Sequence, residues 1–284
     1  MFGHRSDGRK IKTLPAFFKV IPSVMLERND SQVLYKQDIP IKYLDEYIDN
    51  KAKDGIKIAY MHIIYAAIVR VIAERPRLNR FVMNGTTYAR NKIYVSLAIK
   101  KNLTDDGVET TTKIEYQGTE TIFDIKQKLD AIIEQNKEVE ANNETDKLAK
   151  TLGLIPTGLI RVAVKFLKFL DRHGLLPKAI IKASPFHTSV FLTNVGSLGI
   201  DTIYHHLYNF GTTSMFFSMG KKKKSFIYED EEIKEEKCIT LAFVGDERIC
   251  DGYYYANALK QFNRYMKKPE MLEENIIPKE ELGI

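Results

Sequence analysis

The 284-residue sequence lacks tryptophan and contains only two cysteines, Cys238 and Cys250. The cysteines lie outside any CxxC or Cys/His spacing, so they indicate neither a disulfide framework nor a zinc site. Free cysteines are typical of a reducing compartment, and we expect a cytoplasmic protein. No apolar run approaches about 18 residues, which argues against a membrane-spanning helix. The basic N-terminus also lacks the apolar segment of a secretory signal.

The short motifs of several enzyme classes are also missing. The sequence contains no GxGxxG, Walker A, GxSxG or HExxH motif, and no zinc-finger, helix-turn-helix or RNA-binding pattern. His205 and His206 would point to opposite faces of a strand, so they cannot ligate one metal ion from one face. His62, on an apolar helix, is interpreted as a core histidine with satisfied hydrogen bonds. We therefore expect no metal site and no nucleic-acid partner.

The composition is that of a globular protein, with 44% hydrophobic and 28% charged residues and a net charge of +6. The basic residues are mostly interleaved with acidic ones, which favours a solvated surface. An anionic small molecule would also suit this charge. The segment KKKKSFIYEDEEIKEEK (221–237) is interpreted as a long hairpin with oppositely charged arms, because cross-strand Lys–Glu pairs are favourable.

Hydrophobic periodicity and turn residues predict helices and strands in irregular alternation. Such alternation predicts an α/β or α+β fold with a mixed sheet, and the length suits one domain spanning 1–284. The Asn84-Gly85 pair predicts a type I′ turn. The expected elements are a strand hairpin over 20–40, helices over 41–53, 58–75 and about 120–140, a hairpin over 81–89, a strand over 93–101, a loop over 141–147, and strands over 189–200, 213–220 and 238–245.

A basic amphipathic helix is expected over 159–174. Apolar residues recur along it, with Arg161, Lys165, Lys168 and Arg172 between them. Such a helix can lie on a membrane surface. More often it packs its apolar face on the core while the long basic side chains reach water. We favour core packing and do not expect membrane contact.

The stretch DERICDG (246–252) follows an apolar strand and precedes a helix. Cys250 beside Asp251 could be a nucleophile if a cation or a helix N-terminus lowered the pKa of its thiol. A cysteine after an apolar strand is more often a small buried hydrophobe. The second interpretation is favoured.

Taken in order, five segments resemble the CoA-dependent acyltransferases, the family of chloramphenicol acetyltransferase and the dihydrolipoyl acyltransferase catalytic domains. They are YKQDIPIKYLDEYI, YMHIIYAAIVRVIAERPRLNRFVMNG, VFLTNVGSLGI, SMG with the hairpin, and ITLAFVGDERICDGYYYANALKQF. The resemblance covers about 15–268, and 142–185 is a candidate insertion. It implies an α/β chloramphenicol acetyltransferase-like fold, with a mixed sheet packed with helices, and a homotrimer with sites between subunits. It also implies CoA or acyl-CoA as a substrate and no covalently bound cofactor.

The resemblance also assigns site residues. The family motif is HxxxDG, whose histidine is the general base. Asp251 and Gly252 match its end, but Glu247 stands at the histidine position. Thr193 matches the hydroxyl that stabilises the oxyanion. Asp251 would brace the loop through an arginine, for which Arg5 and Arg9 are candidates.

Glu247 leaves the activity open. We expect the adjacent Arg248 to act on Glu247 by keeping its carboxylate ionised. A glutamate ordinarily titrates near about 4.3 and a histidine near about 6.5, and losing a general base costs about 10²–10⁴ in rate. We favour a degenerate acyltransferase-like domain, a pseudoenzyme serving as a trimeric binding or structural module. One alternative is an active acyltransferase that uses Glu247, or a group from a neighbouring subunit, as its base. The other is a membrane- or partner-docking protein acting through helix 159–172. We expect Glu247 to lie within a few ångströms of Thr193 of a neighbouring subunit and to line a channel.

Partner domains are also missing from the sequence. No lipoyl domain and no subunit-binding domain is recognised in it. Action within a 2-oxo acid dehydrogenase complex would therefore need the lipoyl domain of another chain.

Overall fold

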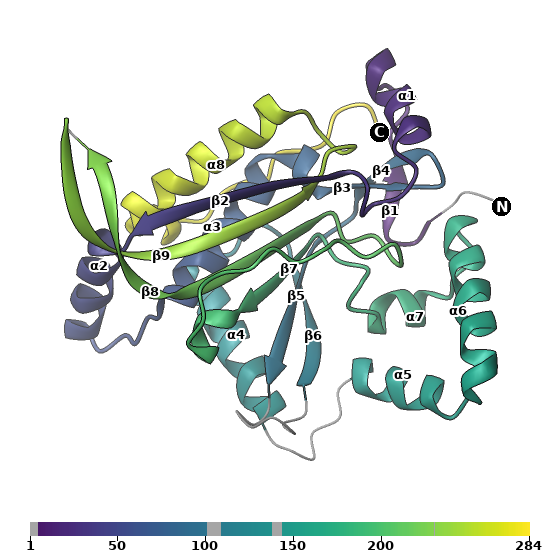
Figure 1. Ribbon diagram of the computed structural model, residues 1–284, viewed down its shortest axis with the longest axis horizontal. Helices are drawn as coiled ribbons and strands as arrows, with labels where there is room; N and C mark the ends of the chain where they lie inside the picture. Colours follow the sequence, from purple (N-terminus) through teal and green to yellow (C-terminus); the bar gives the residue numbers. More distant parts are fainter. Residues whose placement is uncertain (1–4, 101–108, 138–143, 230) are drawn as a thin grey trace.

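A six-stranded mixed sheet forms the centre of the protein (Figure 1). The computed structural model describes residues 5–100, 109–137, 144–229 and 231–284. The strand β7 runs parallel to its neighbours β5 and β8, and the other pairs are antiparallel. This arrangement confirms the expected α/β class with a mixed sheet. The sheet order is β2 (Gln32–Pro40), β9 (Glu232–Asp246), β8 (Met215–Glu229), β7 (Val190–Asn194), β5 (Ile93–Lys100) and β6 (Glu109–Tyr116).

A small antiparallel sheet and several helices complete the fold. The small sheet has the order β1 (Gly8–Lys10), β4 (Thr86–Arg90) and β3 (Arg80–Met83). None of the described helices is long and apolar enough to cross a membrane. The α-helices are α1 (Ala16–Val24), α2 (Lys42–Lys53), α3 (Tyr60–Glu74), α4 (Ile122–Lys137), α5 (Glu144–Gly153), α6 (Thr157–Arg172), α7 (Lys178–Ala183) and α8 (Gly252–Lys267), and the 3-10 helices are η1 (Pro76–Asn79), η2 (Val195–Leu198) and η3 (Pro269–Leu272).

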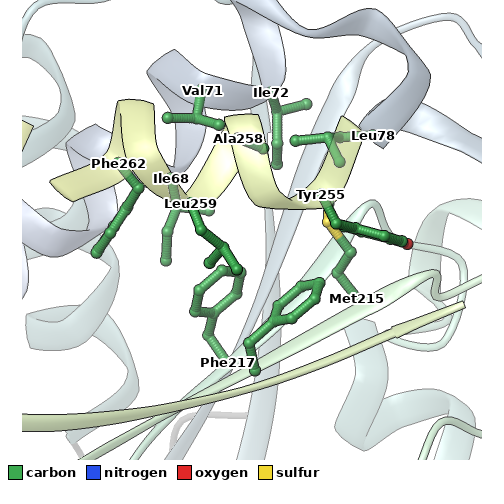
Figure 2. Close-up of a pocket in the computed structure, with 11 residues that line it drawn as sticks. Ile68, Val71, Ile72, Leu78, Met215, Phe217, Tyr255, Ala258, Leu259 and Phe262 are labelled. Carbon is green, nitrogen blue, oxygen red and sulfur yellow. The ribbon is translucent and has the colours of Figure 1, made fainter. Parts of the chain in front are cut away.

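The main core lies between the sheet and the helices α3 and α8. Every residue of α3 from His62 to Ala73 is buried, as expected for a helix that is apolar on all sides. Figure 2 shows the apolar gap where α3 and α8 meet the sheet, with Phe217 pointing toward the helices. The hydroxyl group of Tyr255, at the edge of this gap, donates a hydrogen bond of 2.8 Å to the carbonyl oxygen of Asp246. This gap is therefore part of the core and offers no group for catalysis.

Several local predictions are confirmed. The helices expected over 41–53 and 58–75 are α2 and α3. Asn84 and Gly85 both have positive φ angles, 49° and 68°, as a type I′ turn requires. The charged segment 221–237 lies in the β8–β9 hairpin, where Lys224 forms a cross-strand ion pair with Glu235 at 2.5 Å.

Three predictions of secondary structure are wrong. The first arm of the hairpin expected over 20–40 is helix α1, because Phe17, Val20 and Val24 recur at helical spacing on one face. Residues 144–147 of the expected loop lie in α5, and 141–143 fall outside the described residues. The strand expected over 189–200 ends at Asn194, where η2 begins.

Part of the apolar surface of α6 is exposed, which departs from the preferred interpretation of helix 159–174 as packed on the core. Its apolar side chains Leu159, Val162, Phe166 and Phe169 are exposed. The pattern of the sequence gives a helix with two faces, but it does not say which face meets the protein. Other apolar side chains of the helix, Ile160, Val164 and Leu167 among them, are half-buried, so the apolar surface of α6 extends beyond the part that the domain covers.

Candidate functional site

Thr193 lies at the end of the central parallel strand β7. Its Oγ1 is 3.0 Å from Nε2 of His205, within hydrogen-bond distance. Both side chains are only partly buried, so a ligand can reach them. The hydroxyl group predicted to stabilise an oxyanion is therefore next to an imidazole ring.

The residues after Thr193 fix the end of the strand. The Oδ1 atom of Asn194 accepts a hydrogen bond of 3.2 Å from the backbone N–H of Ser197, which caps η2. Gly196 passes so close to β8 that an added Cβ would lie 2.4 Å from the carbonyl oxygen of Gly220. The TNVG sequence thus turns the chain sharply where β7 meets β8, and it holds Thr193 at the turn.

His205 belongs to the irregular segment between η2 and β8, and not to a strand as the sequence analysis assumed. Its ring stacks on Phe216 of β8 with centroids 4.3 Å apart and an angle of 16°. Burial, and secondarily the neighbouring His206, lower the pKa of His205 below the ordinary histidine value. The imidazole is therefore neutral at neutral pH and able to accept a proton.

Glu247 lies on the loop after β9, with its side chain exposed. Its backbone N–H donates a hydrogen bond of 2.8 Å to the carbonyl oxygen of Ser31. No described residue donates a hydrogen bond to its carboxylate. The side chain faces a surface pocket that Val33, Tyr35 and Lys260 also line. The loop thus holds the backbone of Glu247 but leaves its carboxylate free within the subunit.

The flanking residues of Glu247 form a buried ion pair. Arg248 donates two hydrogen bonds of 2.8 Å to the carboxylate of Asp246. Arg28 approaches the same carboxylate at 3.6 Å. Arg248 was expected to act on Glu247, and this expectation is wrong because its guanidinium is held by Asp246 and by the carbonyl oxygens of residues 25 and 26. This pair fixes the conformation of the loop.

Asp251 begins helix α8 as its N-cap. Its Oδ1 accepts a hydrogen bond of 2.8 Å from the backbone N–H of Tyr254. The arginine nearest to its carboxylate is Arg77, with Nη1 4.0 Å from Oδ2. The candidate partner Arg5 instead pairs with Asp7 and Asp171, each at 2.8 Å.

Arg9, the other candidate partner of Asp251, lies in β1 of the small sheet, where it pairs with residue 89. The pairing of Asp251 with Arg5 or Arg9 is therefore wrong. The bracing role of Asp251 remains a prediction, and helix capping is a mechanism for it.

Cys250 and His62 carry no chemistry in this structure. Both cysteines are free and buried. Burial raises the pKa of the Cys250 thiol well above its ordinary value, which disfavours the reactive thiolate. The Nδ1 atom of His62 accepts a hydrogen bond of 3.0 Å from the backbone N–H of Ala59, and its Nε2 is 2.9 Å from Asp130. His62 is thus a satisfied core histidine, as predicted.

The sequence analysis missed a buried polar cluster around His187. His187 lies between Ser184 and Asp171, at 2.8 and 3.1 Å, and is fully enclosed. Its partners satisfy it, and it packs between β7 and the end of α6. Among the described residues, no group of three or more His, Cys, Asp or Glu side chains could hold a metal ion.

Comparisons with known proteins find a family model and solved structures that are similar to this chain. Residues 182–273 match the family model of the 2-oxoacid dehydrogenases acyltransferase catalytic domain. This stretch contains Thr193, His205 and the DERICDG loop. No curated protein matches the sequence.

Solved structures show the same fold. A probable dihydrolipoamide acetyltransferase from Listeria monocytogenes is similar with a TM-score of 0.57 and 14% identity, over 92% of this chain and 95% of that chain. The dihydrolipoamide acetyltransferase of Azotobacter vinelandii gives 0.59 and 12%, over 93% and 94%. Chloramphenicol acetyltransferase gives 0.54 and 12%, over 92% and 100%. The protein thus has the fold of the CoA-dependent acyltransferases, as its sequence motifs indicated.

Proposed function

We propose that the protein is a CoA-dependent acyltransferase in which His205 is the general base and Thr193 stabilises the oxyanion. The observation that carries this proposal is the 3.0 Å contact between Thr193 Oγ1 and His205 Nε2. A hydroxyl group that can donate to an oxyanion, beside a neutral imidazole that can accept a proton, provides two groups that acyl transfer needs. His205 would then replace the histidine that the HxxxDG motif lacks.

The two groups satisfy each other in the free protein, and a bound substrate would separate them. His205 Nε2 takes the proton of an acceptor thiol or hydroxyl group, and the acceptor attacks the thioester carbonyl carbon. The hydroxyl group of Thr193 donates a hydrogen bond to the oxyanion that forms. When the intermediate collapses, the C–S bond to CoA breaks and the CoA thiolate takes the proton from His205.

We further propose a homotrimer in which Glu247 of one subunit faces Thr193 of the next. The resemblance of the motifs supports this arrangement, as does the likeness of the fold to the cubic core of the pyruvate dehydrogenase complex. An exposed carboxylate with no described partner is consistent with a side chain that completes its contacts across an interface. Glu247 would then border the site rather than act as its base.

The acceptor is proposed by class only. A dihydrolipoyl group carried by another chain and a small diffusible alcohol or thiol both fit a base that takes a proton from sulfur or oxygen. CoA or acyl-CoA is the proposed donor, and no covalently bound cofactor is required. Because the two cysteines are free and buried, we retain the prediction of a reducing, cytoplasmic compartment.

A second candidate function is a degenerate module that binds CoA without turnover. The observation that favours it is the exposed Glu247 at the position of the motif histidine. In this case, the contact between Thr193 and His205 would be structural, and replacing His205 would not change the rate of acyl transfer.

The test is the release of free thiol from acetyl-CoA with dihydrolipoamide or chloramphenicol as acceptor. We expect wild-type turnover, a loss of about 10²–10⁴ in kcat for His205→Ala, and little change for the matched control His206→Ala. Glu247→Ala should keep most of the activity. Turnover abolished in Glu247→Ala but retained in His205→Ala would contradict the assignment. CoA binding by calorimetry without turnover in any variant would favour the second candidate.

A further inference from the structure

Helix α6 presents an apolar stripe to solvent. The stripe consists of Leu159, Val162, Phe166 and Phe169, whose side chains are 57%, 61%, 59% and 53% exposed. Their spacing of three and four residues places them on one face of the helix. Leu154, in the turn before the helix, is 86% exposed and adds to this apolar surface. An apolar stripe of this kind, left uncovered, indicates a partner.

Basic side chains form a row beside the stripe. Arg161, Lys165 and Lys168 follow each other at the same helical spacing, on the flank of the stripe. No described residue forms an ion pair or a hydrogen bond with any of the three side chains. Positive charge therefore accompanies the apolar surface and is not neutralised within the domain.

The end of α6 is firmly attached to the domain. Asp171, in its last turn, is buried and pairs with Arg5 at 2.8 Å and with His187 at 3.1 Å. Arg172 pairs with Glu27 at 2.9 Å, just beyond α1. Figure 1 shows α6 standing at the edge of the molecule, away from the central sheet. The helix is thus held in place while its apolar and basic faces point outward.

We propose that α6 docks the protein on an anionic lipid surface. The helix would lie in the plane of the interface, with the stripe among the acyl chains and the basic row on the lipid phosphates. This inference goes beyond the proposed acyl transfer and does not depend on it. It also departs from the expectation from the sequence, because the apolar side chains of α6 that the domain partly covers do not include the stripe, which stays exposed.

Helix α1 shows why lipid is favoured over a second copy of the chain. It also exposes an apolar stripe, Phe17, Val20 and Val24, at 69%, 58% and 69%. Only one basic residue, Lys19, lies within α1. An apolar stripe with little charge suits a protein interface, whereas the row of unneutralised charges on α6 suits phosphate groups.

The test is flotation of the 284-residue protein with vesicles of pure phosphatidylglycerol and of pure phosphatidylcholine. We expect binding to the anionic vesicles that weakens with added salt. Changing Arg161, Lys165 and Lys168 to glutamine should lower the partition coefficient by about 100-fold, since each charge near the surface accounts for about fivefold. The variant Phe166→Ser/Phe169→Ser should also lose binding.

The controls carry equal changes elsewhere on the surface. Changing the exposed Lys12, Lys57 and Lys279 to glutamine alters the net charge equally and should leave flotation within about twofold of wild type. Phe17→Ser serves as the apolar control. Circular dichroism of every variant ensures that a loss of binding is not a loss of folding.

Three results would overturn the proposal. They are no flotation with anionic vesicles, flotation that is equal for the α6 variants and their controls, and a change of oligomeric state in Phe166→Ser/Phe169→Ser without any vesicle binding. The last result would assign the stripe to contacts between copies of the chain.

Discussion

Replacing Asp246 by alanine should strongly destabilise the protein, because its carboxylate is fully buried between two arginines. Arg248 donates two hydrogen bonds to it and Arg28 lies 3.6 Å away. Burial lowers the pKa of Arg28 to about 10, even though Asp246 opposes this shift. Without the carboxylate, both guanidinium groups would remain buried and lack their counter-charge.

The expected loss is about 3–5 kcal/mol in the free energy of unfolding, the usual cost of removing one partner of a buried pair. For a chain of this size, that corresponds to a fall in Tm of about 10 °C. Thermal and urea unfolding followed by circular dichroism would measure it. The adjacent Glu247→Ala is the matched control, and it should change stability by less than about 0.5 kcal/mol because its side chain is exposed. A loss below about 1 kcal/mol for Asp246→Ala would refute the reasoning.

Three further predictions follow from other buried groups. Burial alone would raise the pKa of Asp171, but the hydrogen bond from His187 and the charge of Arg5 outweigh burial and lower this pKa. The ionised carboxylate therefore stabilises the fold above its ordinary pKa, and this stability should be lost as the pH falls below about 4. Urea unfolding measured against pH should show this loss in the wild type and not in Asp171→Asn. Gly196→Ala should lower the free energy of unfolding by more than about 2 kcal/mol, because a Cβ atom would lie 2.4 Å from the carbonyl oxygen of Gly220. An unchanged Tm would contradict this prediction. Cys250 should react with a thiol reagent only as fast as the protein unfolds, because its thiol is buried and its pKa is raised; rapid labelling of the native protein would argue otherwise.

Much of the fold could be predicted from the sequence because local patterns determine it. The strongly apolar run 58–75 predicted a central helix. The Asn84-Gly85 pair predicted a turn in which both residues have positive φ angles. The order of motifs around TNVG and DERICDG predicted the acyltransferase fold. Asp251 was correctly expected next to a helix start, where it forms the N-cap of α8.

The contact between Thr193 and His205 could not be predicted in the same way. His205 lies in a segment without regular structure, so no period of the sequence indicates where its ring points. The sequence analysis treated His205 and His206 as residues of a strand, so the alternation of side chains along a strand was the only guide to where the imidazole of His205 points. The loop between η2 and β8 instead brings His205 back to the sheet, where it lies beside Thr193 of β7 and stacks on Phe216 of β8. Such long-range contacts depend on the whole fold.

The orientation of α6 and the partner of Arg248 were mispredicted for a related reason. An amphipathic pattern defines two faces of a helix, but the contacts of Asp171 with Arg5 and His187 decide which face meets the domain. Likewise, adjacency in sequence suggested that Arg248 acts on Glu247, whereas their backbone directs the two side chains apart. Arg248 pairs with Asp246 because the carboxylate of Asp246 is buried and needs a counter-charge, whereas that of Glu247 is exposed.

The pH dependence of kcat/KM for acyl transfer tests the central assignment most directly. If neutral His205 is the base, kcat/KM should fall on the acidic side with a pKa below the ordinary histidine value of 6.5. The rate should stay constant above that value, because the imidazole is already neutral there. The same acidic limb should remain in Glu247→Gln. An acidic limb that disappears in Glu247→Gln would contradict the account and make Glu247 the base.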